Sequence, residues 1–180
     1  SSDGGSGGAT LDGEGLSRVL YVTGGGTLTL EHVHLARGRV HGDGACALVE
    51  HGSTLLMTGG GLRDCRPFGD DGNAGNGGGL GLINGSYATL LGANIESCAA
   101  SYGGGVSVIG SSLVLLNLTI ADSSTLVSDR QSGNGTHGGA VFAYAANVSA
   151  SGVDITRCNS FDGGAVYLTT DSVATFVQSN

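Results

Sequence analysis

One short stretch, residues 103–108 (Gly-Gly-Gly-Val-Ser-Val), decides the fold of this 180-residue chain. It joins a run of small residues to an apolar pair at positions i and i+2. Six such pairs recur along the chain, and from the second onward each follows a small-residue run: Leu20/Val22, Cys46/Leu48, Leu80/Leu82, Val106/Val108, Val141/Ala143 and Val166/Leu168. Successive pairs lie 26, 34, 26, 35 and 25 residues apart, so short and long steps alternate. This spacing predicts a repeat architecture, in which each unit buries its apolar face only against its neighbours.

Each unit has the composition of three short strands. The apolar pair alternates at period two, which is typical of a strand with one buried face. A second apolar strand follows, as at residues 89–91, and a third ends in an aliphatic residue: Leu35, Leu62, Ile95, Ile120 or Ile155. Because such units leave no room for crossover helices, we predict an all-β parallel β-helix, a solenoid of about six rungs of three short strands. The alternative, a β-sandwich of hairpins, explains the alternation but not the recurring spacing.

The repeats also suggest a domain organisation. Residues 1–18 form a Gly-rich N-terminal segment or a partial first rung, and residues 19–180 form a single β-helix domain. The chain stops inside its last repeat, so we expect it to be part of a longer chain. The long steps place their extra residues at one corner, in segments 66–76 and 124–137. We expect longer corner loops there on alternate rungs. Two interpretations of these loops remain open: they form a functional ridge along one edge, or they are loops that tolerate insertions and have drifted in length.

Composition excludes several classes of protein. The chain has 36 Gly but one Pro and no collagen period, and its 39% hydrophobic residues are too regularly placed for disorder. The formal charge of −8, without basic clusters, argues against nucleic acid or anionic membranes as partners. The longest mostly apolar run, residues 113–120, is far shorter than the roughly 20 residues of a transmembrane helix. We therefore expect no membrane insertion in this segment.

Two stretches of the chain resemble a known surface repeat. Residues 95–106 read Ile-Glu-Ser-Cys-Ala-Ala-Ser-Tyr-Gly-Gly-Gly-Val, and residues 155–166 read Ile-Thr-Arg-Cys-Asn-Ser-Phe-Asp-Gly-Gly-Ala-Val. They are similar to repeats of the polymorphic outer-membrane protein family and related pectin-lyase-like β-helices. At the position where that repeat carries Asn, this chain has Cys65, Cys98 and Cys158. The resemblance covers roughly residues 19–175 and implies a right-handed parallel β-helix on an extracellular surface.

Four Asn-x-Ser/Thr sequons are candidate N-glycosylation sites: Asn84, Asn117, Asn134 and Asn147. Asn117 lies between Leu116 and Leu118 on an alternating strand, so its side chain is expected to point outward. Asn84 and Asn147 border apolar residues in the same way, while Asn134 lies in the second long loop. All four can be exposed, which glycosylation requires. Their occupancy depends on passage through a eukaryotic secretory route.

The cysteines suggest a disulfide. Cys65 and Cys98 fall in one column on adjacent rungs, near the Cα separation that a disulfide accepts, and are our candidate pair. Their parallel Cβ directions leave stacked free thiols as the alternative. Cys46 is expected to act as a small buried hydrophobe between Leu20 and Leu80. The cysteine spacings do not match a zinc site, and we predict no metal site.

A catalytic constellation is not evident in the sequence. Glycoside hydrolysis needs two carboxylates about 5–9 Å apart, yet Asp154 aligns with Asn94 and Thr119 on the preceding rungs. The pair Asp70-Asp71 is the best acidic cluster, and a solvated loop explains it better than a Ca²⁺ site. His32 and His34 lie two residues apart and are better explained by an exposed strand face than by a metal site. We therefore predict no catalytic residue and no cofactor.

These observations favour a non-enzymatic extracellular structural module. We expect a glycosylated, stiff β-helical rod of a cell-surface layer, appendage or fibril. Its expected partners are N-linked glycans and other copies of the chain, with head-to-tail assembly into a filament as a hypothesis. Two alternatives stay open: a polysaccharide-active, pectin-lyase-like enzyme, and a surface adhesin that binds glycan or protein through its corner loops.

Overall fold

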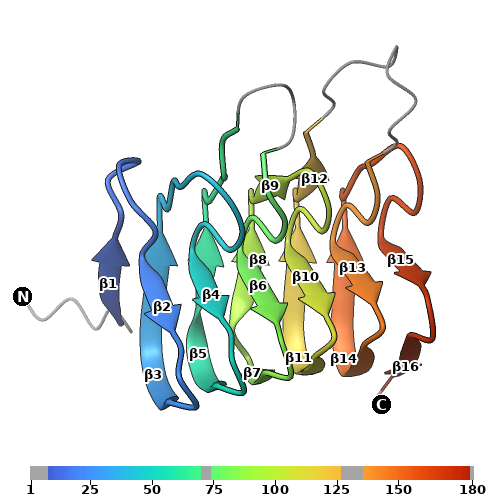
Figure 1. Cartoon of the computed structure of the whole chain (residues 1–180), viewed down its shortest axis with the longest axis horizontal. Coiled ribbons are helices and arrows are strands. Elements are labelled where there is room, and N and C mark those ends of the chain that lie inside the picture. The colour runs from blue at the N-terminus through green and yellow to red at the C-terminus, as the bar shows by residue number, and fades with distance from the viewer. Residues whose placement is uncertain (1–7, 70–73, 127–135, 179–180) are drawn as a thin grey trace, which may run out of the picture.

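The computed structural model describes residues 8–69, 74–126 and 136–178, and over these residues the protein is all-β, without a helix. Two sheets face each other, and their strands follow one another in sequence order along the long axis of the molecule (Figure 1). We call the six-stranded one the short-strand sheet: β2 (Leu20–Val22), β4 (Ala47–Val49), β6 (Leu80–Ile83), β10 (Val106–Ile109), β13 (Val141–Tyr144) and β15 (Val166–Thr169).

The eight-stranded sheet is called the long-strand sheet. Its members are β1 (Ala9–Asp12), β3 (Thr27–Ala36), β5 (Thr54–Arg63), β7 (Tyr87–Leu91), β8 (Asn94–Glu96), β11 (Ser112–Ala121), β14 (Asn147–Thr156) and β16 (Val173–Val177). A two-stranded sheet joins β9 (Ala99–Ala100) to β12 (Ser124–Thr125). All of these strand pairings are parallel, and each strand pairs with its equivalent in the next repeat. We number the repeats 1 to 6 from β2/β3 to β15/β16.

The register confirms one predicted column and corrects another. The third-strand column runs in register as expected: Leu35, Leu62, Ile95, Ile120 and Ile155. In repeat 2, however, Ala47 pairs with Leu20 and Leu80, so the inward pair is Ala47/Val49 and not Cys46/Leu48. The reason lies in the turn that precedes each short strand.

A left-handed glycine sets this register. It stands three residues before the first inward residue of repeats 2 to 6: Gly44, Gly77, Gly103, Gly138 and Gly163. At Gly103, with φ +62°, a Cβ atom would overlap the carbonyl oxygen of Val106. Gly44 makes the same approach to Ala47. The position of Gly44 therefore selects Ala47 as the inward residue.

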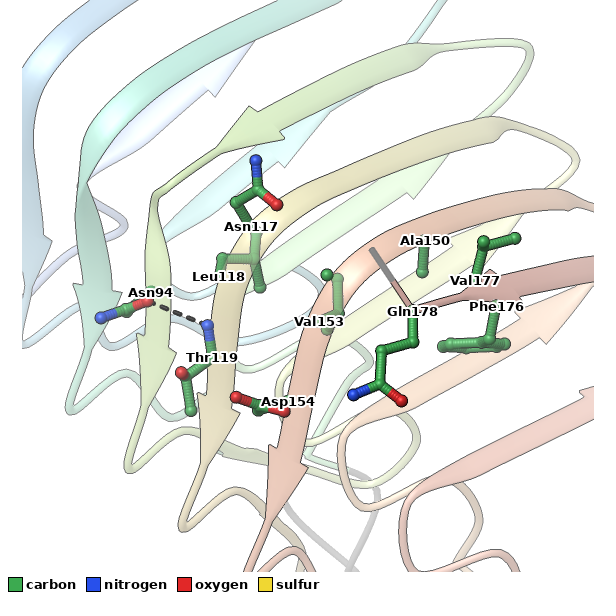
Figure 2. Close-up of a pocket in the computed structure, with 11 residues that line it drawn as sticks. Asn94, Asn117, Leu118, Thr119, Ala150, Val153, Asp154, Phe176, Val177 and Gln178 are labelled. Atoms are coloured by element: carbon green, nitrogen blue, oxygen red, sulfur yellow. Dashed lines mark hydrogen bonds between the residues drawn. The ribbon is translucent and has the colours of Figure 1, made fainter. Parts of the chain in front are cut away.

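The predicted second and third strands of a unit are one continuous strand in four repeats. Strands β3, β5, β11 and β14 each have ten residues. In β11 the inward residues are Leu113 and Leu115 before Asn117, and Leu118 and Ile120 after it. Asn117 has φ +50° and lies at the bend between the two halves (Figure 2). A single left-handed residue thus turns the strand without ending its ladder.

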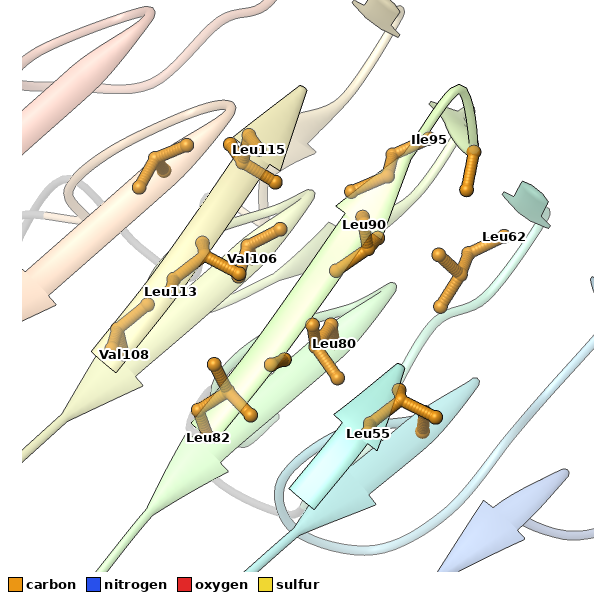
Figure 3. Packing of buried hydrophobic residues seen from close by; sticks show 14 of the residues in the cluster. Leu55, Leu62, Leu80, Leu82, Leu90, Ile95, Val106, Val108, Leu113 and Leu115 are labelled. Atoms are coloured by element: carbon orange, nitrogen blue, oxygen red, sulfur yellow. The ribbon is translucent and has the colours of Figure 1, made fainter. Parts of the chain in front are cut away.

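The core consists of aliphatic side chains from both sheets. The largest fully buried ones belong chiefly to repeats 2 to 4, where they stack from one repeat to the next (Figure 3): Leu55, Leu62, Leu80, Leu82, Leu90, Ile95, Leu113 and Leu115. Burying one such side chain contributes about 1.5–3 kcal/mol. Because neighbouring repeats are only ~4.8 Å apart, the stacked side chains of these central repeats leave no room for water between them.

We expect the adjacent substitutions Leu90→Ala and Leu91→Ala to differ sharply. Leu90 is fully buried, whereas Leu91 is 39% exposed on the opposite face of β7. Leu90→Ala should lower the free energy of unfolding by about 2–5 kcal/mol because it leaves a cavity. Leu91→Ala should change it by less than about 1 kcal/mol. Urea denaturation followed by circular dichroism measures both, and equal losses would contradict the assigned strand faces.

A second pair of substitutions tests the turn. Gly110 also has a left-handed φ, of +56°, but no heavy atom lies within 4 Å of a Cβ built there. Gly110→Ala should therefore cost about 1–2 kcal/mol from backbone conformation alone. Gly103→Ala should cost at least about 1–3 kcal/mol more, because its methyl group overlaps Val106. The same denaturation assay gives the difference, and a Gly103→Ala protein as stable as Gly110→Ala would refute the close approach.

Candidate functional site

The sequon asparagines occupy outward corners and strand ends. Asn84 is exposed and left-handed, with φ +57°, in the turn between β6 and β7. Asn117 is exposed at the bend of β11. Asn147 is exposed at the first position of β14. Asn134 lies outside the described residues. The three described side chains are thus all accessible to a bulky modification.

A groove of about 690 Å³ lies beside Asn117 (Figure 2). Residues of β8, β11 and β14 line one side of it, among them the core residues Leu118 and Ala150, and the end of β16 with Gln178 lines the other. The Oδ1 atom of Asn94 accepts a hydrogen bond of 2.9 Å from the backbone N–H of Thr119. Asp154, which pairs in register with Thr119, is the one carboxylate among the described lining residues. The groove therefore offers amide, hydroxyl and single-carboxylate chemistry, which is not the acid pair of a glycosidase.

The disulfide prediction was wrong in its partner. Cys65 is bonded to Cys46, with a Cα–Cα separation of 5.4 Å, and not to Cys98. The backbone N–H of Ala99 donates to the carbonyl of Cys65 at 3.0 Å, so Cys98 does stack beside Cys65 as expected. Side chains stacked in one column are parallel and do not face each other. Cys46 directly precedes β4 at the start of repeat 2, and Cys65 follows β5 at its end, so the two side chains meet across the repeat. The one-residue shift set by Gly44 is what turns Cys46 from a column member into a disulfide partner.

The remaining thiols are free and protected. Cys98 is fully buried, and burial raises the pKa of its thiol to about 12. Its Sγ lies 3.3 Å from the carbonyl oxygen of Glu96, two residues back in the chain. Cys158 makes the same contact with Thr156, also at 3.3 Å, and is half-buried. Burial also raises the pKa of the Cys158 thiol. Both groups therefore stay protonated near neutral pH and are poor nucleophiles.

An aromatic cluster on the outer side of the short-strand sheet was not anticipated from the sequence. The ring of His137 stacks on Tyr167 with 4.3 Å between centroids, and Phe142 lies 5.2 Å from Tyr102. The Nδ1 atom of His137 is 3.3 Å from Oδ2 of Asp162. The residues of each contacting pair are 25 or more positions apart in the chain, but Tyr102, His137 and Asp162 each directly precede a left-handed glycine. Aligning the repeats on those glycines would have revealed the cluster.

Two polar atoms near this cluster lack a hydrogen-bond partner within the described part of the chain. They are Oγ of Ser107, which is 1% exposed and pairs in register with Phe142, and Oδ1 of Asn76. Asn76 and His137, the last residues of the two long segments, both bridge to Tyr102 in the intervening repeat. The ends of both long segments therefore meet at one edge of the molecule, beside the aromatic rings.

The metal candidates remain separate. His32 has φ +53°, and its ring lies over Gly59, where a Cβ would be 2.6 Å from Nδ1. His41 instead contacts the ring of Phe68, with 5.8 Å between centroids. Over residues 8–69, 74–126 and 136–178, no group of three or more His, Cys, Asp or Glu side chains could hold a metal ion. Asp70-Asp71 lies outside the described residues.

Comparison of the chain with protein-family models, with curated proteins and with solved structures finds no match. Within the residues that the structure describes, there is also no helix with the length and apolar character needed to cross a bilayer.

The cysteine assignment predicts how many thiols react. Without reductant, iodoacetamide should label Cys158 slowly and leave Cys98 unlabelled in the folded protein, because a buried, protonated thiol does not react. Unfolding in urea should expose two thiols, and adding reductant should expose four. Mass spectrometry of the intact protein counts the labels, with Cys158→Ser as the control that removes the slow one. Labelling of Cys46 in the unreduced, unfolded chain would rule out the Cys46–Cys65 bond.

Proposed function

We propose that the chain forms a right-handed parallel β-helix and serves as a non-enzymatic structural module of a cell-surface layer, appendage or fibril. One observation carries the proposal: parallel ladders continue in register through six successive repeats, over a continuous apolar core. A repeat protein of this kind gains stability along one axis, because each repeat packs on the next. The proposed module acts through mechanical stiffness, and its outward side chains are free to contact partners or to carry glycans.

Extracellular placement is supported by two features. The Cys46–Cys65 disulfide fits an oxidising compartment, since such bonds are rare in the cytosol. Three sequon asparagines, Asn84, Asn117 and Asn147, are exposed, as N-linked glycans require. The proposed rod is therefore a secreted glycoprotein.

Head-to-tail self-association is part of this proposal. Among the described residues, the long-strand sheet has β1 at one end of its strand order and β16 at the other. An end strand presents backbone N–H and C=O groups that can pair with another strand. Joining unlike ends in this way does not close on itself and so builds a filament.

A surface adhesin is the second candidate function, favoured by the aromatic cluster. Tyr102 and Tyr167 are half-buried and combine ring faces with phenol hydroxyl groups, a combination that suits glycan recognition, and the buried Phe142 packs against both rings. The cluster lies beside the ends of both long segments. An adhesin would contact a foreign glycan or protein there, whereas a structural rod would contact its own copies.

Glycopeptide mass spectrometry of the natively secreted, unreduced protein tests the proposal. We expect N-glycans on at least two of Asn84, Asn117 and Asn147, because all three side chains project from the surface. Asn→Gln at an occupied site should remove one glycan mass, while Asn94→Gln, outside any sequon, should remove none. Bare asparagines together with four free thiols would refute a secreted glycoprotein.

A further inference from the structure

The outer face of the long-strand sheet carries a regular array of nearly uncharged side chains before the bend. In each of the six repeats the inward residues are apolar, as with Leu113 and Leu115, so the alternate residues point outward. The parallel strand pairings align these outward residues in three columns. We call them the hydroxyl–aliphatic face: Thr27, Thr54, Tyr87, Ser112, Asn147, Val173; Thr29, Leu56, Thr89, Val114, Ser149, Thr175; Glu31, Thr58, Leu91, Leu116, Ser151, Val177.

This face is depleted in charge. Glu31 is its one charged member, although the whole chain has a formal charge of −8. Beyond the bend, the outward positions of the long-strand sheet include Arg63 on β5, Glu96 on β8 and Asp154 on β14. In four repeats both halves belong to one continuous strand, so strand formation alone does not explain the difference. The depletion therefore points to a contact that charge would oppose.

Large apolar side chains of this face are open to solvent. In repeats 2 and 3, which have neighbours on both sides, Leu56 is 36% exposed and Tyr87 and Leu91 are each 39% exposed. They are interspersed with threonines, and the hydroxyl of Thr89 donates to the hydroxyl of Tyr87 at 3.1 Å. Exposed apolar groups gathered on one flat face are typical of an interaction surface.

We propose that the hydroxyl–aliphatic face docks against the same face of a second copy of this chain. The inference deepens the proposed function, on which it rests, by supplying the side-by-side contact of a layer or fibril. Two copies carrying −8 each repel one another, and this face lets them approach without bringing carboxylates together. A two-fold axis places the same uncharged columns opposite each other. Sheets then pack face to face at about 10 Å, as in a β-sandwich.

The size of the face fits a weak, specific dimer. Six repeats at ~4.8 Å and three alternate positions at ~6.7 Å, with their side-chain widths, cover roughly 500 Å² per copy. A pair would bury about 1,000 Å², near the lower limit for a specific interface. We therefore expect a weak, reversible dimer rather than a permanent one.

Asn147 links this surface to glycosylation. It lies in the first column of the face, next to Ser112 and Val173. A glycan at Asn147 would keep the two faces apart, whereas glycans at Asn84 or Asn117 lie outside the array. Pairing therefore requires copies in which Asn147 is bare.

Analytical ultracentrifugation of the oxidised, unglycosylated chain, over about 1 μM to 1 mM, tests the pairing. We expect a monomer–dimer equilibrium that stops at two copies, because a two-fold contact is closed. Raising the salt concentration from about 10 mM to 150 mM should strengthen it, because screening reduces the repulsion between acidic chains. Association through ion pairs would instead weaken, and that result would overturn the proposal.

Matched lysine substitutions locate the surface. Val114→Lys and Thr119→Lys both lie on β11 and point outward, but only Val114 belongs to the hydroxyl–aliphatic face. Each makes the net charge less negative by the same amount, so each should reduce general repulsion equally. Val114→Lys should weaken the dimer at least tenfold, and Thr119→Lys should leave it within about twofold. Leu91→Lys provides a second variant on the face, and circular dichroism checks that all three remain folded.

The outcomes separate this inference from the proposed function. A chain that stays monomeric to 1 mM, or equal effects of Val114→Lys and Thr119→Lys, would overturn the lateral contact and leave the glycopeptide result untouched. An open-ended series of oligomers insensitive to Val114→Lys would indicate strand-edge association and also overturn it. Bare sequons in a protein that dimerises as described would refute the secreted glycoprotein alone.

Discussion

The close approach of a left-handed glycine to the backbone that follows it governs this structure. At Gly44, Gly77, Gly103, Gly138 and Gly163 the chain turns into the short-strand sheet, and a Cβ atom there would overlap a carbonyl oxygen three residues ahead. The turn fixes which residue of the next strand faces inward. Because side chains alternate with period two, a shift of one residue would exchange the inner and outer faces of that strand. One such glycine in each of repeats 2 to 6 therefore aligns the apolar columns of the short-strand sheet.

The same turn accounts for the chemistry of the cysteines. Gly44 directs Ala47 into the inner column, which leaves Cys46 at the entrance of repeat 2, opposite Cys65. Cys98 occupies the position next to Cys65 along the stack but has no partner facing it, and burial holds its thiol protonated. Cys65 and Cys98 occupy equivalent positions but differ in oxidation state, because only Cys65 faces another cysteine across its own repeat.

The outward columns differ far more than the inward ones. Inside, every repeat offers aliphatic or small residues, because each must pack on two neighbours. Outside, the long-strand sheet is nearly uncharged before the bend and charged after it, while the short-strand sheet gathers Tyr102, His137, Phe142 and Tyr167. Packing constrains the first set and leaves the second free to vary. The surfaces proposed to bear on function therefore lie on the outside, where the residue types differ from one repeat to the next.

The sequence by itself determined the repeat length, the all-β class and the column from Leu35 to Ile155, because apolar periodicity and glycine runs are local signals. It also showed that Asp154 aligns with Thr119 rather than with another carboxylate. Only the tertiary structure decided that Cys46 faces Cys65, that one strand bends at Asn117 instead of ending, and that His137 stacks on Tyr167. The two contacts join residues 19 and 30 positions apart. Strand register brings such residues together, because a shift of one residue exchanges the inner and outer faces of a strand, and register is set by backbone geometry that composition does not reveal.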